Sequence, residues 1–380
     1  MSISTTSPPT DQQPEKKLST PVILFFVSLA AAVLIALCLG PAARVTSAST
    51  TPANLFGLRR LFGSQAGSAS PSAASSIRRE LASASASASA SASEQLRRSS
   101  SANKMKTPIY FLSHGGPNIM YDREHPAYSK LGEIGREITG KVKPRAVVVF
   151  SAHWQAGRDT IQVNTAEKTE LIYDFYGFPS HYYKEKYPNV GSKEVANKVL
   201  DALKDAGVKA EGVKRGLDHG VWASFKCAFE PDSNPLNVPI VQVSLFNTED
   251  PAQHYRLGQA VAKLREENIL IIVSGMAVHN LRDLQFTWGN PKPLPYTTSF
   301  DEAMKDAVTK PPAEREQAMI DLLKRPDARQ AHPSFEHLLP IHIGAGAAGD
   351  DLGKRLWTLK EGSMSWAQYR FGDVGNSSSL

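Results

Sequence analysis

Cysteine is scarce in this chain: only Cys38 and Cys227 occur among 380 residues. Two cysteines, one of them inside an apolar stretch, do not make the disulfide framework that staples small secreted domains. They are also too few for a cysteine-based zinc site. A metal bound by this protein would therefore be held by nitrogen and oxygen atoms.

The sequence also lacks several motifs of common enzyme classes. There is no His-Glu-x-x-His pair for a zinc protease, no phosphate-binding P-loop, no Gly-x-Ser-x-Gly turn and no Gly-x-Gly-x-x-Gly turn after a predicted strand. The sequence therefore gives no support to a nucleotide-binding enzyme or to the commonest type of serine hydrolase.

Positive charge is not spread evenly over the chain. The net charge is +6, but much of it comes from arginines that few acids oppose in the first hundred residues. From about Lys106 onward, acids and bases are closely mixed. Because the charge belongs to the N-terminal region, we expect no nucleic-acid partner.

The first 104 residues form three segments of different composition. Residues 1–20 are a polar tail, and residues 21–40 contain an apolar run, 22–39, that is long enough as a helix to cross a membrane. The Ser/Ala-rich residues 41–104 predict a disordered linker. We predict a single-pass membrane tether through 22–39, with the catalytic domain outside the bilayer. The alternatives are an organelle-targeting sequence and translation from Met105, which would give a cytoplasmic protein.

Residues 105–375 have the pattern of a folded α/β domain. Short apolar runs alternate with segments whose apolar residues recur at three- and four-residue spacing. This alternation favours a single domain with a mostly parallel central sheet covered by helices. The predicted strands are 109–112, 146–150, 160–163, 240–244 and 269–273, and the predicted helices are 192–206, 251–267, 300–308, 313–323 and one that begins near Ser334.

Five histidines lie in distinctive short segments of this domain: His114, His153, His219, His279 and His337. Three of these segments follow an apolar run that is predicted to be a strand. The carboxyl ends of parallel strands meet at one edge of a sheet, where ligands and metals bind. Imidazoles at that edge indicate a metal site, although packing explains each histidine equally well when it is taken singly. The histidines at 125, 181, 254, 332 and 342 lack such contexts and are interpreted as surface or packing residues.

Two of the segments place a carboxylate beside a histidine. Asp218 precedes His219 and can orient its ring or raise its basicity, while a loop that caps a helix beginning near Trp222 is the alternative. Glu336 precedes His337 in a predicted helix, where adjacent side chains diverge by about 100°. Only one of these two residues can therefore face a given site, and the spacing does not decide between them.

Six motifs, taken together and in order, give a more specific signal than any one of them. Over residues 107–372 the chain resembles the class III extradiol ring-cleaving dioxygenases, and among them the DOPA 4,5-dioxygenase-type branch. The resemblance rests on Ser113-His114-Gly115-Gly116-Pro117, Ser151-Ala152-His153-Trp154, Tyr173-Asp174-Phe175-Tyr176-Gly177-Phe178-Pro179, Asp218-His219-Gly220-Val221-Trp222, Ser274-Gly275 with His279-Asn280-Leu281-Arg282, and Glu336-His337-Leu338-Leu339-Pro340.

The resemblance implies a role for each of the five histidines. His114, His153 and His337 match metal ligands, His279 matches an acid and base or a fourth ligand, and His219 matches a residue that contacts the substrate. Many relatives use a glutamate as the third ligand, so Glu336 stays an alternative to His337 at this position. Because an all-histidine site suits Zn(II) as well as Fe(II), the divalent metal is expected to be one of these two.

The implied function is that of an oxidoreductase that inserts O₂ into a small catechol-type aromatic ring and gives a ring-opened semialdehyde. DOPA is one such substrate, and His279 would accept a proton from it. Two alternatives stay open at this point: a zinc-dependent hydrolase on the same scaffold, and a non-catalytic, membrane-tethered zinc-binding protein. The sequence does not indicate the oligomeric state.

Overall fold

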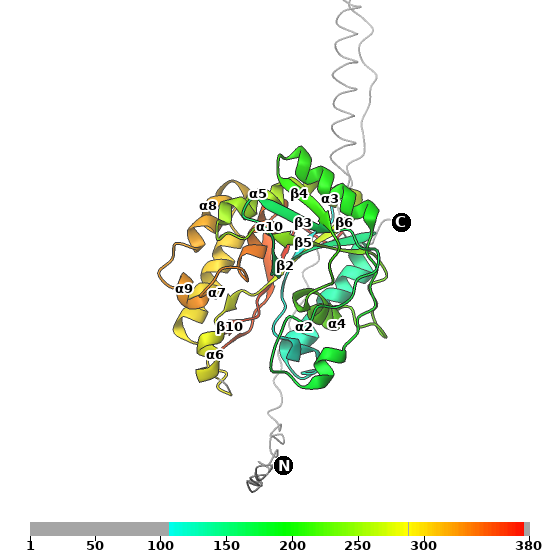
Figure 1. The fold of residues 1–380 in the computed structure, drawn as a ribbon. Coiled ribbons are helices and arrows are strands. Elements are labelled where there is room, and N and C mark those ends of the chain that lie inside the picture. Colours follow the sequence, from blue (N-terminus) through cyan, green and yellow to red (C-terminus); the bar gives the residue numbers. More distant parts are fainter. Residues whose placement is uncertain (1–105, 288, 376–380) are drawn as a thin grey trace, which may run out of the picture. The chain divides into compact units, whose positions relative to one another are not determined.

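The computed structural model describes residues 106–287 and 289–375 (Figure 1). Its centre is an eight-stranded sheet of order β4-β3-β5-β2-β6-β1-β11-β8, and three short strands form a second sheet of order β7-β10-β9. The strands are β1 (Ile109–Ser113), β2 (Ala146–Gln155), β3 (Thr160–Asn164), β4 (Lys209–Val213), β5 (Ile240–Leu245), β6 (Ile269–Gly275), β7 (Val278–His279), β8 (Gly353–Trp357), β9 (Lys360–Glu361), β10 (Met364–Ser365) and β11 (Gln368–Phe371).

The middle of the large sheet is parallel, but its flanks are not. Strands β5, β2, β6 and β1 run parallel to one another, whereas β3 is antiparallel to β5, and β11 is antiparallel to β1 and β8. Four of the seven strand pairings, including β3 with β4, are parallel, as predicted for a mostly parallel sheet, whereas the three antiparallel pairings were not predicted. Strands β8 and β11 were not predicted because they are short and mix polar with apolar residues.

Helices cover both faces of the large sheet, since its central strands are buried on both sides. Successive residues of β2 point to opposite faces: Val148 and Phe150 join the core with α3, α5 and α10, while Val147 and Val149 join the core with α2 and α4 (Figure 1). The α-helices are α2 (Pro126–Glu137), α3 (Lys193–Asp205), α4 (His219–Ala228), α5 (Pro251–Val261), α6 (Leu281–Thr287), α7 (Pro295–Val308), α8 (Pro312–Leu322), α9 (Ala328–Ala331) and α10 (Leu339–Ala347). Short 3₁₀ turns are η1 (Pro117–Met120), η3 (Ser180–Lys184) and η4 (Ala262–Glu267), and η2 (Ile138–Val142) is a π-helix.

The five predicted strands and the first four predicted helices are present within a few residues of their predicted bounds. Two differences affect the histidines. Strand β2 continues to Gln155, so His153 lies inside the strand and not after it. Helix α4 begins at His219, with Asp218 as its N-cap, and not near Trp222.

The prediction of a helix that begins near Ser334 was wrong. Glu336 to Leu338 form a turn, and α10 starts at Leu339. The physical reason is that the His337 carbonyl accepts a hydrogen bond from Met276 N at 2.9 Å, so it is not free to continue a helix. Pro340 in the first turn of α10 is also typical of a helix that starts there.

The membrane-spanning part of the predicted fold class is also corrected. The segments predicted as tail, tether and linker, residues 1–20, 22–39 and 41–104, lie outside the described residues. Within 106–287 and 289–375, no helix combines the length and the apolar character that a membrane crossing requires. An apolar run of sufficient length is necessary for a span but does not prove one. The predicted membrane-anchored localisation and tether are therefore withdrawn.

Candidate metal centre

Three histidines from distant parts of the chain meet at the carboxyl ends of the central strands. His114 follows β1, His153 lies near the end of β2, and His337 lies in the turn before α10. The His153 Nε2 atom is 3.1 Å from His114 Nε2 and 3.2 Å from His337 Nε2. Two nitrogens bound to one ion, each about 2.1 Å from it, stand roughly 3.0 to 3.4 Å apart. The spacing of the three imidazoles therefore fits a shared cation.

The end of β6 positions these histidines, although it carries no imidazole itself. Ser274 stands opposite Ser151 in the sheet, the His114 N–H donates to the Gly275 carbonyl at 3.0 Å, and Met276 N–H donates to the His337 carbonyl. A β-carbon on Gly275 would lie 2.2 Å from that carbonyl oxygen. The turn that carries His337 can approach β6 only because glycine occupies this position.

The Nδ1 atom of each of the three imidazoles has a side-chain partner. His153 Nδ1 lies 3.0 Å from Asp174 Oδ2, and His337 Nδ1 lies 2.9 Å from Glu336 Oε1. His114 Nδ1 lies 2.9 Å from Ser274 Oγ. Since that hydroxyl donates its own proton to the Gly220 carbonyl at 2.5 Å, it must accept from His114.

These partners fix the protons on Nδ1 and leave a lone pair on each Nε2. The short Nε2 contacts are then lone pair to lone pair and not hydrogen bonds, so only a cation between the nitrogens makes them favourable. The donor set therefore fits a divalent metal that neutral imidazoles prefer. The sequence left open whether Glu336 or His337 is the third ligand. Glu336 contacts His337 Nδ1, whereas His337 presents Nε2 to His153, so the geometry favours His337.

His219 lies against the same group. A ring nitrogen of His219 lies within 4.8 Å of a ring nitrogen on each of His114 and His153, and its ring centroid is 4.0 Å from that of His153. Its Nδ1 and its backbone N–H both donate to Asp174 Oδ1, at 2.9 and 3.0 Å. The carboxylate that orients His219 is thus Asp174 and not the adjacent Asp218 named in the sequence analysis.

Asp218 has a different set of partners. It is fully buried and accepts hydrogen bonds from Ser151 Oγ at 2.7 Å, from Arg215 at 2.9 Å and from the Gln242 amide. Ser151 Oγ also accepts the backbone N–H of His153 at 3.2 Å. Asp218 therefore holds the end of β2 against the start of α4, the two elements that carry His153 and His219.

His279 lies on β7 and stacks on His337, with ring centroids 3.7 Å apart and an angle of 15° between the planes. It also comes within 4.8 Å of a carboxylate oxygen of Glu336, ring nitrogen to oxygen. Burial lowers the pKa of His279 to about 3, so the ring is neutral at pH 7.

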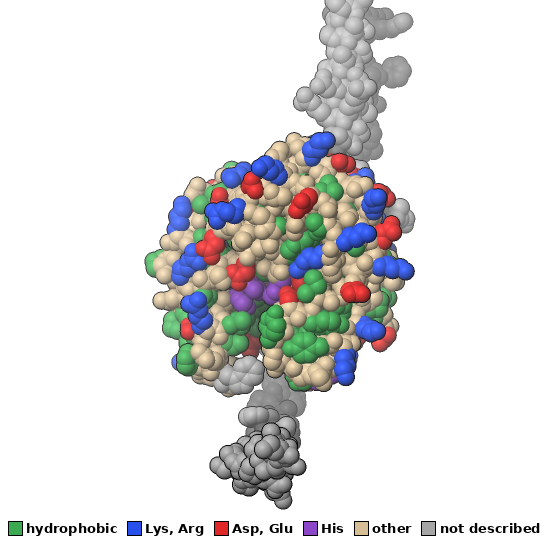
Figure 2. Space-filling view, viewed as in Figure 1, with side chains coloured by type: hydrophobic (Ala, Val, Ile, Leu, Met, Phe, Trp, Pro, Cys, Tyr) green, Lys and Arg blue, Asp and Glu red, His purple; other side chains and the backbone are tan. Residues whose placement is uncertain are grey.

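Burial keeps the rings of His114 and His337 neutral as well. It holds the pKa of His114 and His337 well below the usual range, and neighbouring imidazoles add to this effect. His153 and His279 are partly exposed, whereas the other three rings are buried. The space-filling view shows histidine at the bottom of a hollow with hydrophobic side chains on both sides (Figure 2). A ligand would therefore approach from the side of His153 and His279.

Asp174 and Ser274 are the polar residues that sequence reasoning gave no role. Both lie inside segments that carried the family resemblance, Tyr173 to Pro179 and Ser274-Gly275. Their place in these segments indicated that they belong near the site, but it did not indicate which histidine each residue would contact.

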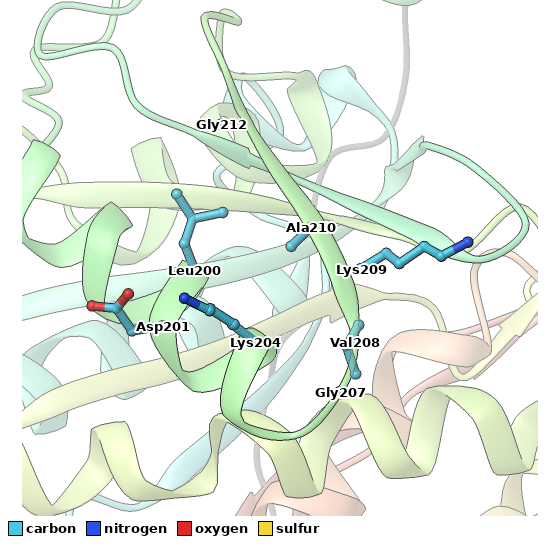
Figure 3. Close-up of a pocket in the computed structure, with 8 residues that line it drawn as sticks. All are labelled: Leu200, Asp201, Lys204, Gly207, Val208, Lys209, Ala210 and Gly212. Atoms are coloured by element: carbon cyan, nitrogen blue, oxygen red, sulfur yellow. The ribbon is translucent and has the colours of Figure 1, made fainter.

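A second hollow lies between α3 and β4, with a volume of about 500 Å³ (Figure 3). Its eight lining residues, all in the described part of the chain, include no histidine. Asp201, Lys204 and Lys209 are its charged groups. It therefore offers no counterpart to the metal-binding chemistry of the histidine cluster.

Comparison with known proteins decides the family. A family model described as the catalytic LigB subunit of aromatic ring-opening dioxygenase matches residues 108–372. The chain belongs to this family. It is 36% identical over 270 residues to a protein of Beta vulgaris named 4,5-DOPA dioxygenase extradiol, covering 69% of this chain and 95% of the relative. A protein of the same name from Escherichia coli K12 is 31% identical over 271 residues, covering 70% and 95%.

A solved structure agrees with the family assignment. The crystal structure of an uncharacterized protein from Escherichia coli K12 matches with a TM-score of 0.56 and 28% identity, and the match covers 70% of this chain and 100% of the other. The family model and the named relatives together confirm the predicted resemblance to class III extradiol dioxygenases of the DOPA-type branch.

This LigB-family protein is therefore an oxidoreductase of the extradiol ring-cleaving dioxygenase class. The family depends on a metal, and the histidine cluster is a candidate site for it. The zinc hydrolase and the non-catalytic zinc-binding protein considered from the sequence are not supported by these relatives.

Proposed function

We propose that residues 105–375 form a catalytic domain that opens the ring of a small catechol by extradiol insertion of O₂, using one divalent metal held by His114, His153 and His337. The observation that carries this proposal is the convergence of three Nε2 atoms at 3.1 and 3.2 Å, with every Nδ1 bound to an acceptor. The metal is Fe(II) or Zn(II), and the redox role of O₂ favours iron.

When bound, such a metal lowers the pKa of a hydroxyl that it coordinates and gives the catechol and O₂ a common site. The protein supplies the remaining functions. The three Nε2 atoms form one side of the site, and their Nδ1 partners keep the rings from turning.

His279 is the residue that we assign to proton transfer. Its ring is neutral at pH 7 and partly exposed, and it stacks directly on the ligand His337. Its exposure and its place beside His337 would let it take the proton of a catechol hydroxyl that contacts it and return that proton later in the reaction. The stacking also argues against its being a fourth ligand, because two parallel rings in contact do not aim their nitrogens at one point.

His219 is assigned to the substrate or to O₂. Its Nδ1–H is bound to Asp174, so its lone pair is on Nε2, and a ring nitrogen of His219 lies within 4.8 Å of ring nitrogens of His114 and His153. The ring of Phe175 packs edge to face on His219, with ring centroids 5.6 Å apart, and places an apolar aromatic surface beside that histidine. An aromatic diol of the size of DOPA suits such a wall, and the names of the relatives point to the same substrate class.

The experiment is anaerobic reconstitution of the full chain with Fe(II), followed by a panel of catechols in an oxygen electrode. We expect O₂ uptake that depends on the catechol, together with a yellow semialdehyde-type product. The zinc-loaded protein is the comparison that identifies the metal. Reconstituted protein that consumes no O₂ with any catechol would contradict the proposed function.

A further inference from the structure

One carboxylate, Asp174, holds two of the five site histidines. Its Oδ2 atom accepts from His153 Nδ1 at 3.0 Å, and its Oδ1 atom accepts from His219 Nδ1 at 2.9 Å. Oδ1 also accepts the backbone N–H of His219 at 3.0 Å. The two rings that share this carboxylate are tilted against each other, with centroids 4.0 Å apart.

We propose that Asp174 is a positioning residue that fixes both His153 and His219 as Nδ1–H tautomers, so that both Nε2 lone pairs face the site. This inference rests on the proposed function, which makes His153 a ligand and places His219 beside the substrate. A carboxylate suits this task because it has two acceptor oxygens, one for each N–H donor. Neither ring can turn over without losing a charge-assisted hydrogen bond.

The backbone around Asp174 is itself held in place. Ile172 N–H donates to the Leu217 carbonyl at 2.7 Å, and Tyr173 Oη donates to the Glu185 carbonyl at 2.6 Å. The backbone that carries the carboxylate is therefore anchored by contacts on the two residues before it. Such partners of metal ligands typically change metal affinity by about 10- to 100-fold when they are removed.

The variant that tests this is Asp174→Asn, which has almost the same size but only one acceptor oxygen. Its amide NH₂ group would face one of the two Nδ1 atoms and would donate to it. That imidazole must then carry its proton on Nε2, where it points into the site and opposes a cation. The substitution should thus change one tautomer without changing the fold.

The direct readout is the ¹⁵N spectrum of histidine-labelled, metal-free full-length protein, with the two rings assigned through His153→Gln and His219→Gln. We expect Nδ1–H for both rings in the wild type and Nε2–H for one of them in Asp174→Asn. The second readout is Co(II) affinity, which should fall by about 10- to 100-fold in the variant. Asp174→Glu keeps both oxygens and should retain both Nδ1–H tautomers, and Asp201→Asn on α3 is the control for an exposed carboxylate.

Two results would overturn the proposal. One is an Nε2–H tautomer for either ring in the metal-free wild type. The other is an Asp174→Asn protein whose tautomers and Co(II) affinity both equal those of the wild type. Neither readout uses a catechol, so failure of the dioxygenase assay and failure of this inference are distinguishable.

Discussion

Buried histidines occur in two surroundings in this molecule, one around the metal centre and one in the helical layer that includes α5 and α10. In the helical layer, His254, His332 and His342 each contact a backbone carbonyl through one ring nitrogen, at 2.8 to 2.9 Å. Their other ring nitrogen is buried and has no partner among the described residues. The His254 ring caps its own helix at Asp250, whereas His332 and His342 tie their elements to the Ala277 and Met319 carbonyls of others.

The histidines of the metal centre have the opposite arrangement. Their Nδ1 atoms contact side-chain oxygens of Ser274, Asp174 and Glu336, and their Nε2 atoms face one another. Burial lowers the pKa in both groups, so the pKa alone does not separate them. What separates them is the direction of the lone pairs: in the metal centre they point to one place.

The largest difference between the two groups should appear in metal binding. His114→Ala removes one of three nitrogens and should lower metal affinity by more than the roughly 100-fold effect of losing a ligand's partner. We expect no metal after desalting of the reconstituted variant, and no turnover, with metal measured by mass spectrometry. His342→Gln is the matched control from the helical layer and should keep a full complement of metal. Wild-type metal content in His114→Ala would remove His114 from the ligand set.

The next largest effect separates proton transfer from metal binding within the site. His279→Ala should keep its metal but lose about 10²- to 10⁴-fold in turnover, the range typical of general acid–base catalysis. Parallel measurements of metal content and O₂ uptake check this. If turnover stays near normal, His279 does not transfer the proton; if the metal is lost, His279 acts as a ligand.

A smaller effect is expected from crowding the rings. A β-carbon on Gly220 would lie 2.6 Å from Ser151 Oγ, 2.7 Å from His153 Cδ2 and 3.3 Å from His114 Cε1, whereas one on Gly140 would meet nothing within 4 Å. Gly220→Ala should therefore displace the His153 ring and lower Co(II) affinity by about 10-fold or more. Gly140→Ala should leave the affinity unchanged. Equal affinities in the two variants would mean that the ring spacing does not control metal binding.

The smallest effect concerns the helical layer and the response to acid. Burial lowers the pKa of His342 to about 4, below the value of about 6.5 in an unfolded chain. The unfolded chain therefore binds the proton more readily, and the stability is complete above pH 6.5 and falls as the pH drops toward 4. The glutamine of His342→Gln can still donate to the Met319 carbonyl, so the substitution should lower the free energy of unfolding by about 1 kcal/mol at pH 7.

This variant should also lose less stability between pH 7 and pH 5 than the wild type, by about 1 to 2 kcal/mol, because it removes one titrating group. Urea unfolding of the metal-free protein at the two pH values measures this difference. An unchanged pH dependence would show that His342 titrates normally in the folded protein.

The sequence predicted the elements better than the contacts between them. Continuous apolar runs identified β1, β2 and β6, and so placed His114 at the correct edge of the sheet. The extension of β2 through Ser151 to Gln155 was missed because those residues are not uniformly apolar, and the sheet extends there by pairing with its neighbours. Local sequence does not contain that information.

The partners of the histidines were less predictable. Asp218 is adjacent to His219 in sequence and was the expected partner, yet Asp174, 45 positions away, makes the contact. The choice between Glu336 and His337 likewise depended on a turn that a contact with β6 imposes. Closeness in sequence does not predict these contacts, because the site is assembled from strands of the sheet and from segments that are distant in the chain, such as those of Asp174 and His337.

The end of β6 has a consequence for stability. Because Ser274, Gly275 and Met276 hold elements that carry His114 and His337, the cluster exists only when β6 has paired with β1 and β2. An unfolded chain has no such cluster, so the free energy of metal binding adds to the free energy of folding. A chelator should therefore lower the melting temperature of the whole domain and make amide hydrogens of the innermost strands exchange faster, as well as stopping the reaction.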